Sequence, residues 1–505
     1  MYDAVFIGGS LRYFGFQKPA GMYRIATELR NNNYSVQCVD LFSVMDENTL
    51  FEILSTVISS DTKILGVATT FLRDGLGGQY FGIPEAKFAT IVEQLKTLNP
   101  NIKIIFGGSQ VARHAFDEIE PFKDLIDICV AGQGETAILA IMNHITNGTD
   151  LDVETINGIT FTSDKKYPFE LFNQSNIQYH PNDIIKKGES LCIEVARGCV
   201  FRCAYCFHDS ARKSFGDMTK NADVLRQELI RNYELFGTTD YYIVDDTIND
   251  SMAKVEYLHK IFTNLPFKIH FTSFARLDLI WKHPEMADML KEIGMVGVVF
   301  GIETMHQEAG RLVGKGLGEK RIKEALETCK NSWKNDVHIT ANFICGLPKE
   351  PVESIRRTVD WLLSDDCPID SAGLQALLIS RKRKISRMDR DPSGKFLCEF
   401  SGEHNYEWKH EHLSYSAATA IKKFFDSKVM SKWPFYYTLN AFALLRMSNI
   451  GIPIKESLQV SKLLKSGHND AKFQGQQESS IHLELSKRTQ QRRNEYINNL
   501  INFSH

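Results

Sequence analysis

Three cysteines lie within eight residues of one another in this sequence, and their spacing could hold a metal centre. The string reads Arg197-Gly198-Cys199-Val200-Phe201-Arg202-Cys203-Ala204-Tyr205-Cys206, which is a C-x3-C-x2-C pattern. Three thiolates in a short loop suit an iron–sulfur cluster or a zinc site. A structural zinc site normally has four protein ligands, and His208 could supply the fourth. On a four-iron cluster the three thiolates would instead leave one iron open to a substrate-like molecule.

The other seven cysteines are scattered along the chain, and we interpret them as small buried side chains. They are Cys38, Cys129, Cys192, Cys329, Cys345, Cys367 and Cys398. The first residues lack a basic segment followed by a long apolar core, so we expect no signal peptide. No apolar run approaches the ~20 residues that a membrane span needs. We therefore expect a cytoplasmic protein in a reducing compartment, where disulfides are rare.

Length and composition indicate a globular chain of about three domains. The 505 residues are 43% hydrophobic and 24% charged, which argues against a disordered protein. A net charge of -3 argues against a dominant, sequence-independent nucleic-acid binder. A basic run from Arg381 to Lys384 leaves a phosphate-bearing or nucleic-acid substrate open, although a solvated loop is the default reading.

Residues 1–150 alternate apolar strand-like runs with helical patterns, which predicts a Rossmann-like, doubly wound parallel sheet. Ligands of such sheets bind outside the carboxyl ends of the strands, where several glycines allow close approach to the backbone. Tight turns between strand and helix are the alternative reading of these glycines. The candidate residues at these ends are Gly8, Gly9, Ser10, Thr69, Thr70, Gly107, Gly108, Gly132, Gly134 and Glu135.

Residues 191–385 repeat the strand–helix alternation six times, which predicts a partial barrel of the TIM type. We expect its strands at Ile193–Val195, Tyr241–Val244, Ile269–Phe274, Val296–Phe300, His338–Ile344 and Gly373–Leu378. The polar residues 151–190 predict a connector that contains a hairpin. Residues 386–505 predict a helical C-terminal domain, with a loop over Ser466–Ser480 because Gly, Gln, Ser and Asn are common there.

The cysteine motif after the first barrel strand resembles that of the radical S-adenosylmethionine (SAM) superfamily. The resemblance continues at the ends of later strands, where a barrel places its active site. It rests on Asp245-Asp246-Thr247, Arg276, Gly301-Ile302-Glu303 and Gly346-Leu347-Pro348.

The resemblance implies that Cys199, Cys203 and Cys206 hold a [4Fe-4S] cluster that cleaves SAM to a 5'-deoxyadenosyl radical. By family position, Tyr205 and the turn at Gly346 would lie near the cofactor, with Tyr205 beside the adenine. Asp245 or Asp246 would approach the methionine amino group, and Glu303 the ribose or the amino end. Arg276 would contact the SAM carboxylate or a substrate anion. A flavodoxin or ferredoxin would supply the electron.

Structural roles remain open for three of these side chains. Asp245 could cap the following helix, and Arg276 and Glu303 could belong to ion pairs that only hold the fold.

The first domain resembles the cobalamin-binding domain that precedes many radical SAM barrels. The similar strings are Pro19–Asp40, Phe106-Gly107-Gly108-Ser109 and Gly132-Gln133-Gly134-Glu135. The Asp-x-His-x-x-Gly string that supplies a lower cobalt ligand in other cobalamin proteins is absent near Gly8–Gly21. With cobalamin bound, the resemblance implies methyl transfer to an unactivated carbon, one SAM methylating cobalt and another forming the radical.

Three alternatives stay open. The first is a rearrangement that uses the same two cofactors, and the second is radical chemistry without cobalamin. The third is a non-catalytic iron–sulfur or zinc protein that uses the barrel as a scaffold. The substrate itself is not indicated by any motif.

Overall fold

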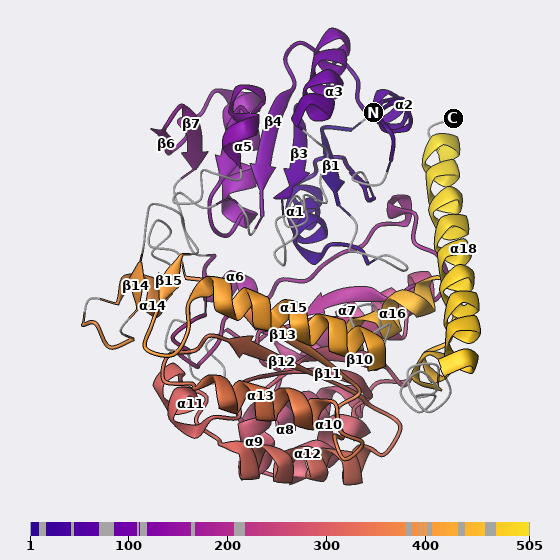
Figure 1. Cartoon of the computed structure of the whole chain (residues 1–505). Coiled ribbons are helices and arrows are strands. Elements are labelled where there is room, and N and C mark those ends of the chain that lie inside the picture. The colour runs from indigo at the N-terminus through magenta and orange to yellow at the C-terminus, as the bar shows by residue number, and fades with distance from the viewer. Residues whose placement is uncertain are drawn as a thin grey trace. The chain divides into compact units, whose positions relative to one another are not determined.

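The computed structural model resolves the chain into two compact units, each of which is described by itself below (Figure 1). The N-terminal unit comprises Met1–Ile193, Asp223–Thr238 and Lys487–His505, and the barrel unit comprises Glu194–Ala222 and Thr239–Ser486. The structure describes residues 2–9, 17–41, 45–69, 85–108, 111, 119–162, 167–206, 218–379, 386–391, 393–396, 398–400, 407–432, 440–459 and 471–503.

A seven-stranded, mostly parallel sheet forms the centre of the N-terminal unit, as the alternation in residues 1–150 predicted. Its order is β2-β1-β3-β4-β5-β7-β6. The bounds are β1 Ala4–Gly8, β2 Val36–Val39, β3 Ile64–Ala68, β4 Lys103–Gly107, β5 Ile128–Val130, β6 Val153–Ile156 and β7 Ile159–Thr162. The hairpin expected within residues 151–190 is the antiparallel pair β6–β7, and β7 adds to the sheet in parallel with β5.

The helices of this unit bury one apolar face each. They are α1 Ala20–Asn31, α2 Glu47–Val57, α3 Glu85–Leu98, α5 Glu135–Asn147, α6 Phe169–Asn173 and α7 Ala222–Phe236, with short 3-10 helices at η3 Glu120–Leu125 and η4 Pro181–Asp183. The core includes a cluster of the rings of Phe88, Phe106 and Phe122, whose centroids lie 5.7–6.0 Å apart.

A second sheet of six strands, in the order β13-β12-β11-β10-β9-β8, forms the expected partial barrel. The bounds are β8 Leu191–Glu194, β9 Asp240–Val244, β10 His270–Ala275, β11 Met295–Glu303, β12 His338–Cys345 and β13 Ser371–Ala376. From β9 to β13 every neighbouring pair is parallel. The carboxyl ends of these strands therefore lie at one edge, as the sequence analysis requires for an active site.

Helices lie on both sides of this six-stranded sheet (Figure 1). One side carries α8 Met252–Phe262, α9 Leu277–Lys282, α10 Glu285–Glu292, α11 Gln307–Val313, α12 Glu319–Trp333 and α13 Val352–Leu362. Between β13 and the C-terminal helices come α14 Arg387–Arg390 and the hairpin of β14 Glu399–Phe400 and β15 Trp408–Lys409. The C-terminal part is helical, with α15 Tyr415–Lys432, α16 Ala441–Asn449 and α18 Ala471–Phe503.

The loop expected over Ser466–Ser480 is wrong from residue 471 onward, where α18 begins. Residues 471–480 are polar, but Gln, Glu and Lys are good helix formers, and the one glycine there, Gly475, costs a helix only about 1 kcal/mol. Among the described helices, none is both long and apolar enough to cross a membrane.

Candidate active site

The cysteine motif forms a loop after β8 that is fastened at several points. Arg197 makes two hydrogen bonds to the Glu194 carboxylate, at 2.8 and 3.0 Å. The backbone N–H of Ala204 donates to the Val313 carbonyl at 3.0 Å. Cys199, Cys203 and Cys206 are half-buried. Of the other seven cysteines, six are buried as predicted, and Cys398 is half-buried instead.

Arg276 lies directly against the cysteine loop. Its Nη1 donates to the Cys203 Sγ at 3.4 Å, and its guanidinium carbon lies 3.8 Å from the centre of the Phe201 ring. The Asp278 carboxylate accepts from Nε at 2.9 Å and from Nη2 at 2.6 Å. The Nε and Nη2 donors of the guanidinium are therefore already paired with a carboxylate inside the protein. This geometry favours the structural role that the sequence left open for Arg276.

The thiols fit a centre that is reached from solvent. Burial raises the pKa of the Cys199 thiol, while Thr247 Oγ1 lies 3.6 Å from its Sγ. The guanidinium of Arg276 places a positive charge beside the Cys203 sulfur. Among the described residues, no three His, Cys, Asp or Glu side chains gather as they would around a single metal ion. His208, the fourth zinc ligand considered above, lies outside the described residues.

Glu303 ends β11 in an unusual backbone conformation. Its φ of 70° lies in the left-handed region, which costs a residue with a Cβ roughly 1–2 kcal/mol. The pairing of β11 with β12 shifts register at the same point, between Gly301 and Glu303. Backbone strain of this kind is retained mainly where it directs a functional side chain.

The Glu303 carboxylate lies between a cation and a phenol. Lys315 Nζ is 3.9 Å from its Oε1, and the Tyr205 hydroxyl hydrogen-bonds to the carboxylate. Burial raises the pKa of Glu303, and Lys315 and Tyr205 oppose that rise. Burial and the charge of Glu303 raise the pKa of Tyr205 in turn. No sequence pattern indicates Lys315, since a single lysine in a loop carries no motif.

The acidic pair after β9 divides into two different environments. Asp245 is buried, and its Oδ2 lies 2.7 Å from the Nζ of the equally buried Lys254. Asp245 does not cap the following helix, because Ser251 occupies the N-cap of α8. Asp246 is half-buried, one position after Asp245. Asp246 is therefore the better placed of the two for an external ammonium group.

Gly346 is required by local packing. Its φ is +98°, and a Cβ there would come within 2.3 Å of the Trp408 ring. Its carbonyl accepts a hydrogen bond from His410 Nε2 at 3.0 Å. The turn at Gly346 thus positions the end of β12 against β15.

The candidate glycines of the N-terminal unit fall into two groups. Gly8 and Gly134 serve packing, since a Cβ on either would meet Met22 at 2.9 Å or Ile25 at 3.0 Å. At the ends of β4 and β5, Gly107 is half-buried, and Gly108 and Gly132 are exposed. A Cβ at Gly107 would meet only Val130, at 3.7 Å. These three positions leave open backbone that a flat cofactor could approach.

Other candidates of this unit have partners inside it. Thr69 Oγ1 donates to the Gly107 carbonyl at 2.9 Å, and Glu135 Oε1 lies 3.7 Å from Arg24 Nε. Gly9 is buried after β1. Ser10 and Thr70 lie outside the described residues.

A buried polar network at the end of β2 was not predicted. Lys18 Nζ lies 2.8 Å from Asp40 Oδ2, which also accepts from the Tyr23 hydroxyl at 2.7 Å. The Tyr496 hydroxyl accepts a hydrogen bond from the Asp40 backbone N–H at 2.8 Å. This network attaches the end of α18 to the N-terminal unit.

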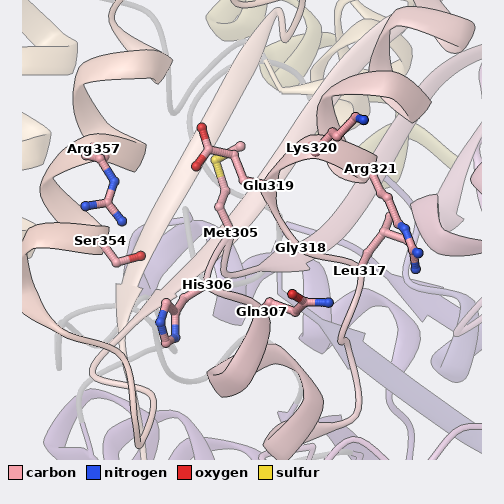
Figure 2. A pocket seen from close by; sticks show the side chains of 10 residues that line it. All are labelled: Met305, His306, Gln307, Leu317, Gly318, Glu319, Lys320, Arg321, Ser354 and Arg357. Atoms are coloured by element: carbon pink, nitrogen blue, oxygen red, sulfur yellow. The ribbon is translucent and has the colours of Figure 1, made fainter.

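Figure 2 shows a pocket of about 440 Å³ on the barrel unit, beside the first residues of α11 and α12. Two of its cations have partners, since Arg321 stacks over Trp281 at 4.5 Å and Lys320 lies 3.9 Å from Glu324, and Arg357 of α13 lines the pocket as well. His306 accepts from the N–H of Ala309 and so caps α11. None of its lining residues belongs to the cysteine loop.

The cysteine motif agrees with a comparison against protein families. Residues 193–362 match the model described as the Radical SAM superfamily. The chain belongs to the radical SAM superfamily. Membership implies a [4Fe-4S] cluster and SAM, and the three half-buried cysteines provide a donor set that fits such a cluster.

Sequence similarity to another protein extends over more of the chain than the residues that match the radical SAM model. The "uncharacterized methyltransferase PH0819" of Pyrococcus horikoshii is 24% identical over 360 residues, which cover 68% of this chain and 72% of that protein.

Two solved structures share the fold. The cobalamin-dependent SAM radical enzyme OxsB with aqua-cobalamin bound matches with a TM-score of 0.65 and 13% identity, over 99% of this chain and 80% of its own. The radical SAM methyltransferase TsrM from Kitasatospora setae, with cobalamin and a [4Fe-4S] cluster, matches with a TM-score of 0.59 and 15% identity, over 77% and 78%. At these identities the likeness concerns the fold, which includes the predicted cobalamin-type domain.

Proposed function

We propose that this radical SAM enzyme binds cobalamin and transfers a methyl group to an unactivated carbon of its substrate. The observation that carries the radical chemistry is the loop of three half-buried thiols, held by Arg276 beside the end of β10 and by Tyr205 beside Glu303. When bound, the cluster supplies the electron that cleaves SAM, and cobalamin supplies a carrier for the methyl group.

The residues at the strand ends bind and orient SAM in this proposal. Asp246 accepts hydrogen bonds from the methionine ammonium, because its partner Asp245 is already neutralised by Lys254. Glu303 accepts from a ribose hydroxyl or from the ammonium group, and the charge of Lys315 opposes the rise in the Glu303 pKa that burial causes. Tyr205 contributes by holding Glu303, and Arg276 by holding the cysteine loop.

Cobalamin in the N-terminal unit is supported by two observations. The backbone at the half-buried Gly107 and at the exposed Gly108 and Gly132 leaves space at the ends of β4 and β5, where ligands of parallel sheets bind. The fold is also that of OxsB and TsrM, whose structures are described with cobalamin. A rearrangement with the same cofactors is the second candidate, since the printed name of OxsB gives it no methyl transfer.

The radical step is tested by anaerobic production of 5'-deoxyadenosine from SAM, with a flavodoxin or ferredoxin system or dithionite as the reductant. We expect product from the native chain and none above background from Cys203→Ala. Cys398→Ala is the matched control, because Cys398 is also half-buried but lies outside the motif. Equal product from native protein and Cys203→Ala would refute the assignment of the cluster, and no product from fully loaded native protein would favour a non-catalytic role.

Cobalamin binding is tested by the absorbance retained after gel filtration of protein mixed with hydroxocobalamin. Gly107→Val should abolish the retention of cobalamin. The fold tolerates the valine side chain, but that side chain would occupy the space at the end of β4 where cobalamin is proposed to bind. Gly21→Ala is the control, since its Cβ would meet nothing within 4 Å. Failure of the native chain to retain cobalamin would leave the radical chemistry without a methyl carrier.

A further inference from the structure

The pocket of Figure 2 lies within the barrel unit, among the first residues of α11, the first residues of α12 and the helix α13. Its volume of about 440 Å³ falls in the range of roughly 300–1,000 Å³ that small-molecule sites occupy. Its described lining residues include none of those assigned to the cluster or to SAM. The pocket is therefore a candidate site for a further ligand.

The lining of this pocket carries an excess of positive charge. Lys320, Arg321 and Arg357 line it, against the single acid Glu319. That acid is already paired, because its Oε1 lies 2.7 Å from the Nζ of Lys323, which is not a lining residue. An anion is therefore the ligand that the charge of the lining favours.

Arg357 is the cation best placed to receive such an anion. Lys320 lies near Glu324 and Arg321 stacks on a ring, as described above. The guanidinium of Arg357, in contrast, has no hydrogen bond or ion pair within the part of the chain that the structure describes. A guanidinium binds phosphate and carboxylate groups through two parallel N–H donors.

The wall that α13 contributes is polar at two positions. Figure 2 shows Ser354 and Arg357 on this helix, and residues three apart share a helix face. Ser354 is 4% exposed, and its Oγ lies 3.5 Å from Glu350 Oε1, which is long for a hydrogen bond. Arg357 is exposed, so its charge is accessible to a ligand that enters from solvent.

The start of α11 contributes two uncharged donors. His306 Nδ1 accepts from the N–H of Ala309 at 3.3 Å, so a neutral ring carries its own hydrogen on Nε2. Burial lowers the pKa of His306, with Glu308 opposing and Arg357 adding to that effect, so the ring is neutral at pH 7. The Gln307 amide likewise has no hydrogen-bond partner among the described residues.

Donors from two helices suit a phosphate better than a carboxylate. A phosphate presents three strong acceptor oxygens that point in different directions, whereas the two oxygens of a carboxylate lie in one plane with their carbon. A bare phosphate would leave most of the pocket unfilled. The apolar side chains of Met305 and Leu317 also line it, and they offer a surface for the organic part of a larger ligand.

We propose that this pocket binds a small phosphate monoester. Its phosphate pairs with Arg357 and accepts hydrogen bonds from His306 and Gln307, and its organic part packs on Met305 and Leu317. This site is additional to the one proposed for SAM and shares none of its residues. The inference goes beyond the proposed function and does not depend on it, because binding is measured without cleavage of SAM.

The test is isothermal titration calorimetry of the full chain, reconstituted anaerobically, with phenyl phosphate, benzoate and benzyl alcohol. The three probes share a benzene ring and differ in the group that the donors would meet. We expect phenyl phosphate to bind at least about tenfold more tightly than benzyl alcohol, because its hydrogen bonds are charge-assisted. It should also bind about threefold more tightly than benzoate, because it offers a third acceptor oxygen.

The donors are tested one at a time. Arg357→Met should weaken phenyl phosphate binding by about tenfold. Arg356→Met is the matched control, because Arg356 is the next residue of the same helix, is 72% exposed, lies 3.9 Å from Glu353 and does not line the pocket. Gln307→Met and His306→Asn should each weaken binding by about threefold. Asparagine at position 306 can still cap α11 but lacks the Nε2 donor.

Thermal unfolding midpoints check that each variant folds. Where His306→Asn does not, the exposed Arg357 and Gln307 decide. No measurable binding of phenyl phosphate, or equal affinities in Arg357→Met and Arg356→Met, overturns the proposal, and benzoate binding as tight as that of phenyl phosphate overturns the choice of a phosphate. A native chain that binds phenyl phosphate as expected but forms no 5'-deoxyadenosine would refute only the proposed function.

Discussion

At the scale of single residues, Arg276 makes the contacts expected of the structural role that the sequence left open beside ligand binding. Its charge is shared by Asp278, the Cys203 thiol and the Phe201 ring. A sequence pattern identifies a conspicuous arginine at a strand end, but it does not tell which carboxylate the side chain will meet. The carboxylate here is only two residues away along the chain.

We predict that Arg276→Lys lowers the iron retained after reconstitution and desalting. Lysine keeps the positive charge but cannot donate to Asp278 and Cys203 while stacking on Phe201. Hydrogen bonds to charged groups contribute roughly 1.5–3 kcal/mol, so a loss of about tenfold in cluster affinity is expected. Arg321→Lys is the control, because Arg321 also stacks on an aromatic ring, that of Trp281. Equal iron content in both variants would contradict a role for Arg276 in holding the loop.

Glu350 is a buried carboxyl group that no sequence pattern indicated. Thr304 Oγ1 donates to its Oε1 at 2.7 Å, whereas its Oε2 has no hydrogen-bond partner among the described residues. Burial raises the pKa of Glu350 from 4.5 to about 7. The folded protein thus binds more protons than the unfolded chain between these two values, so the free energy of unfolding falls as the pH rises from 4.5 through 7.

We predict that Glu350→Gln stabilises the protein above pH 7, by an amount on the order of 3 kcal/mol. Glutamine keeps the acceptor for Thr304 but never has to be buried as an anion. The measurement is the difference in unfolding midpoint between variant and native protein, from pH 5 to pH 8. That difference should grow with pH, and Glu353→Gln, at a side chain 66% exposed, should show none. A difference independent of pH would mean that Glu350 is not the titrating group.

At the scale of elements, the apolar pattern predicted most strands to within two residues. Burial on both faces makes parallel strands continuous apolar runs, and these are visible in any sequence. The prediction was wrong for the start of α18, where it rested on amino-acid composition alone. It also missed α2, although the helix-capping residue and the apolar spacing of α2 are visible in the sequence. There Asp46 caps the helix, and Leu50, Ile53, Leu54 and Val57 are spaced as one helix face.

The site residues likewise divide into those that a local pattern identifies and those whose roles depend on the fold. The cysteine loop is local in the chain, and its motif was sufficient to identify it. Lys315, Lys254 and Lys18 each pair with an acid that other elements bring near, so their roles depend on the fold. The register shift at Gly301–Glu303 is likewise a property of two paired strands and not of one.

The end of α18 stabilises the N-terminal unit through a buried ion pair. Arg492 Nη2 lies 2.8 Å from Glu189 Oε2, and both side chains are buried. We predict that Arg492→Met destabilises the unit by about 3–5 kcal/mol, because Glu189 is left as an uncompensated buried charge. Gln491→Met, at an exposed position of the same helix, is the control for chemical denaturation. A loss equal to that of the control would mean that Glu189 finds another partner.

At the scale of the whole molecule, the two cofactors are assigned to different units. The cysteines and Glu303 belong to the barrel unit, and the glycines at the ends of β4 and β5 belong to the N-terminal unit. Each unit has its own sheet and its own core, so loss of one site leaves the fold of the other intact. The proposed methyl transfer, in contrast, requires both.

We therefore predict a reciprocal pattern of losses in two variants of the full chain. Cys203→Ala should lose iron and 5'-deoxyadenosine formation but retain cobalamin through gel filtration. Gly107→Val should lose cobalamin and yet keep its iron and its cleavage of SAM, because the side chain fits the fold and lies in the other unit. Any methylated product should disappear in both. The controls are Cys398→Ala and Gly21→Ala, which should match native protein in all measurements. If Gly107→Val also lost SAM cleavage while remaining folded by circular dichroism, the radical step would depend on cobalamin, and independent assignment of the two cofactors would be wrong.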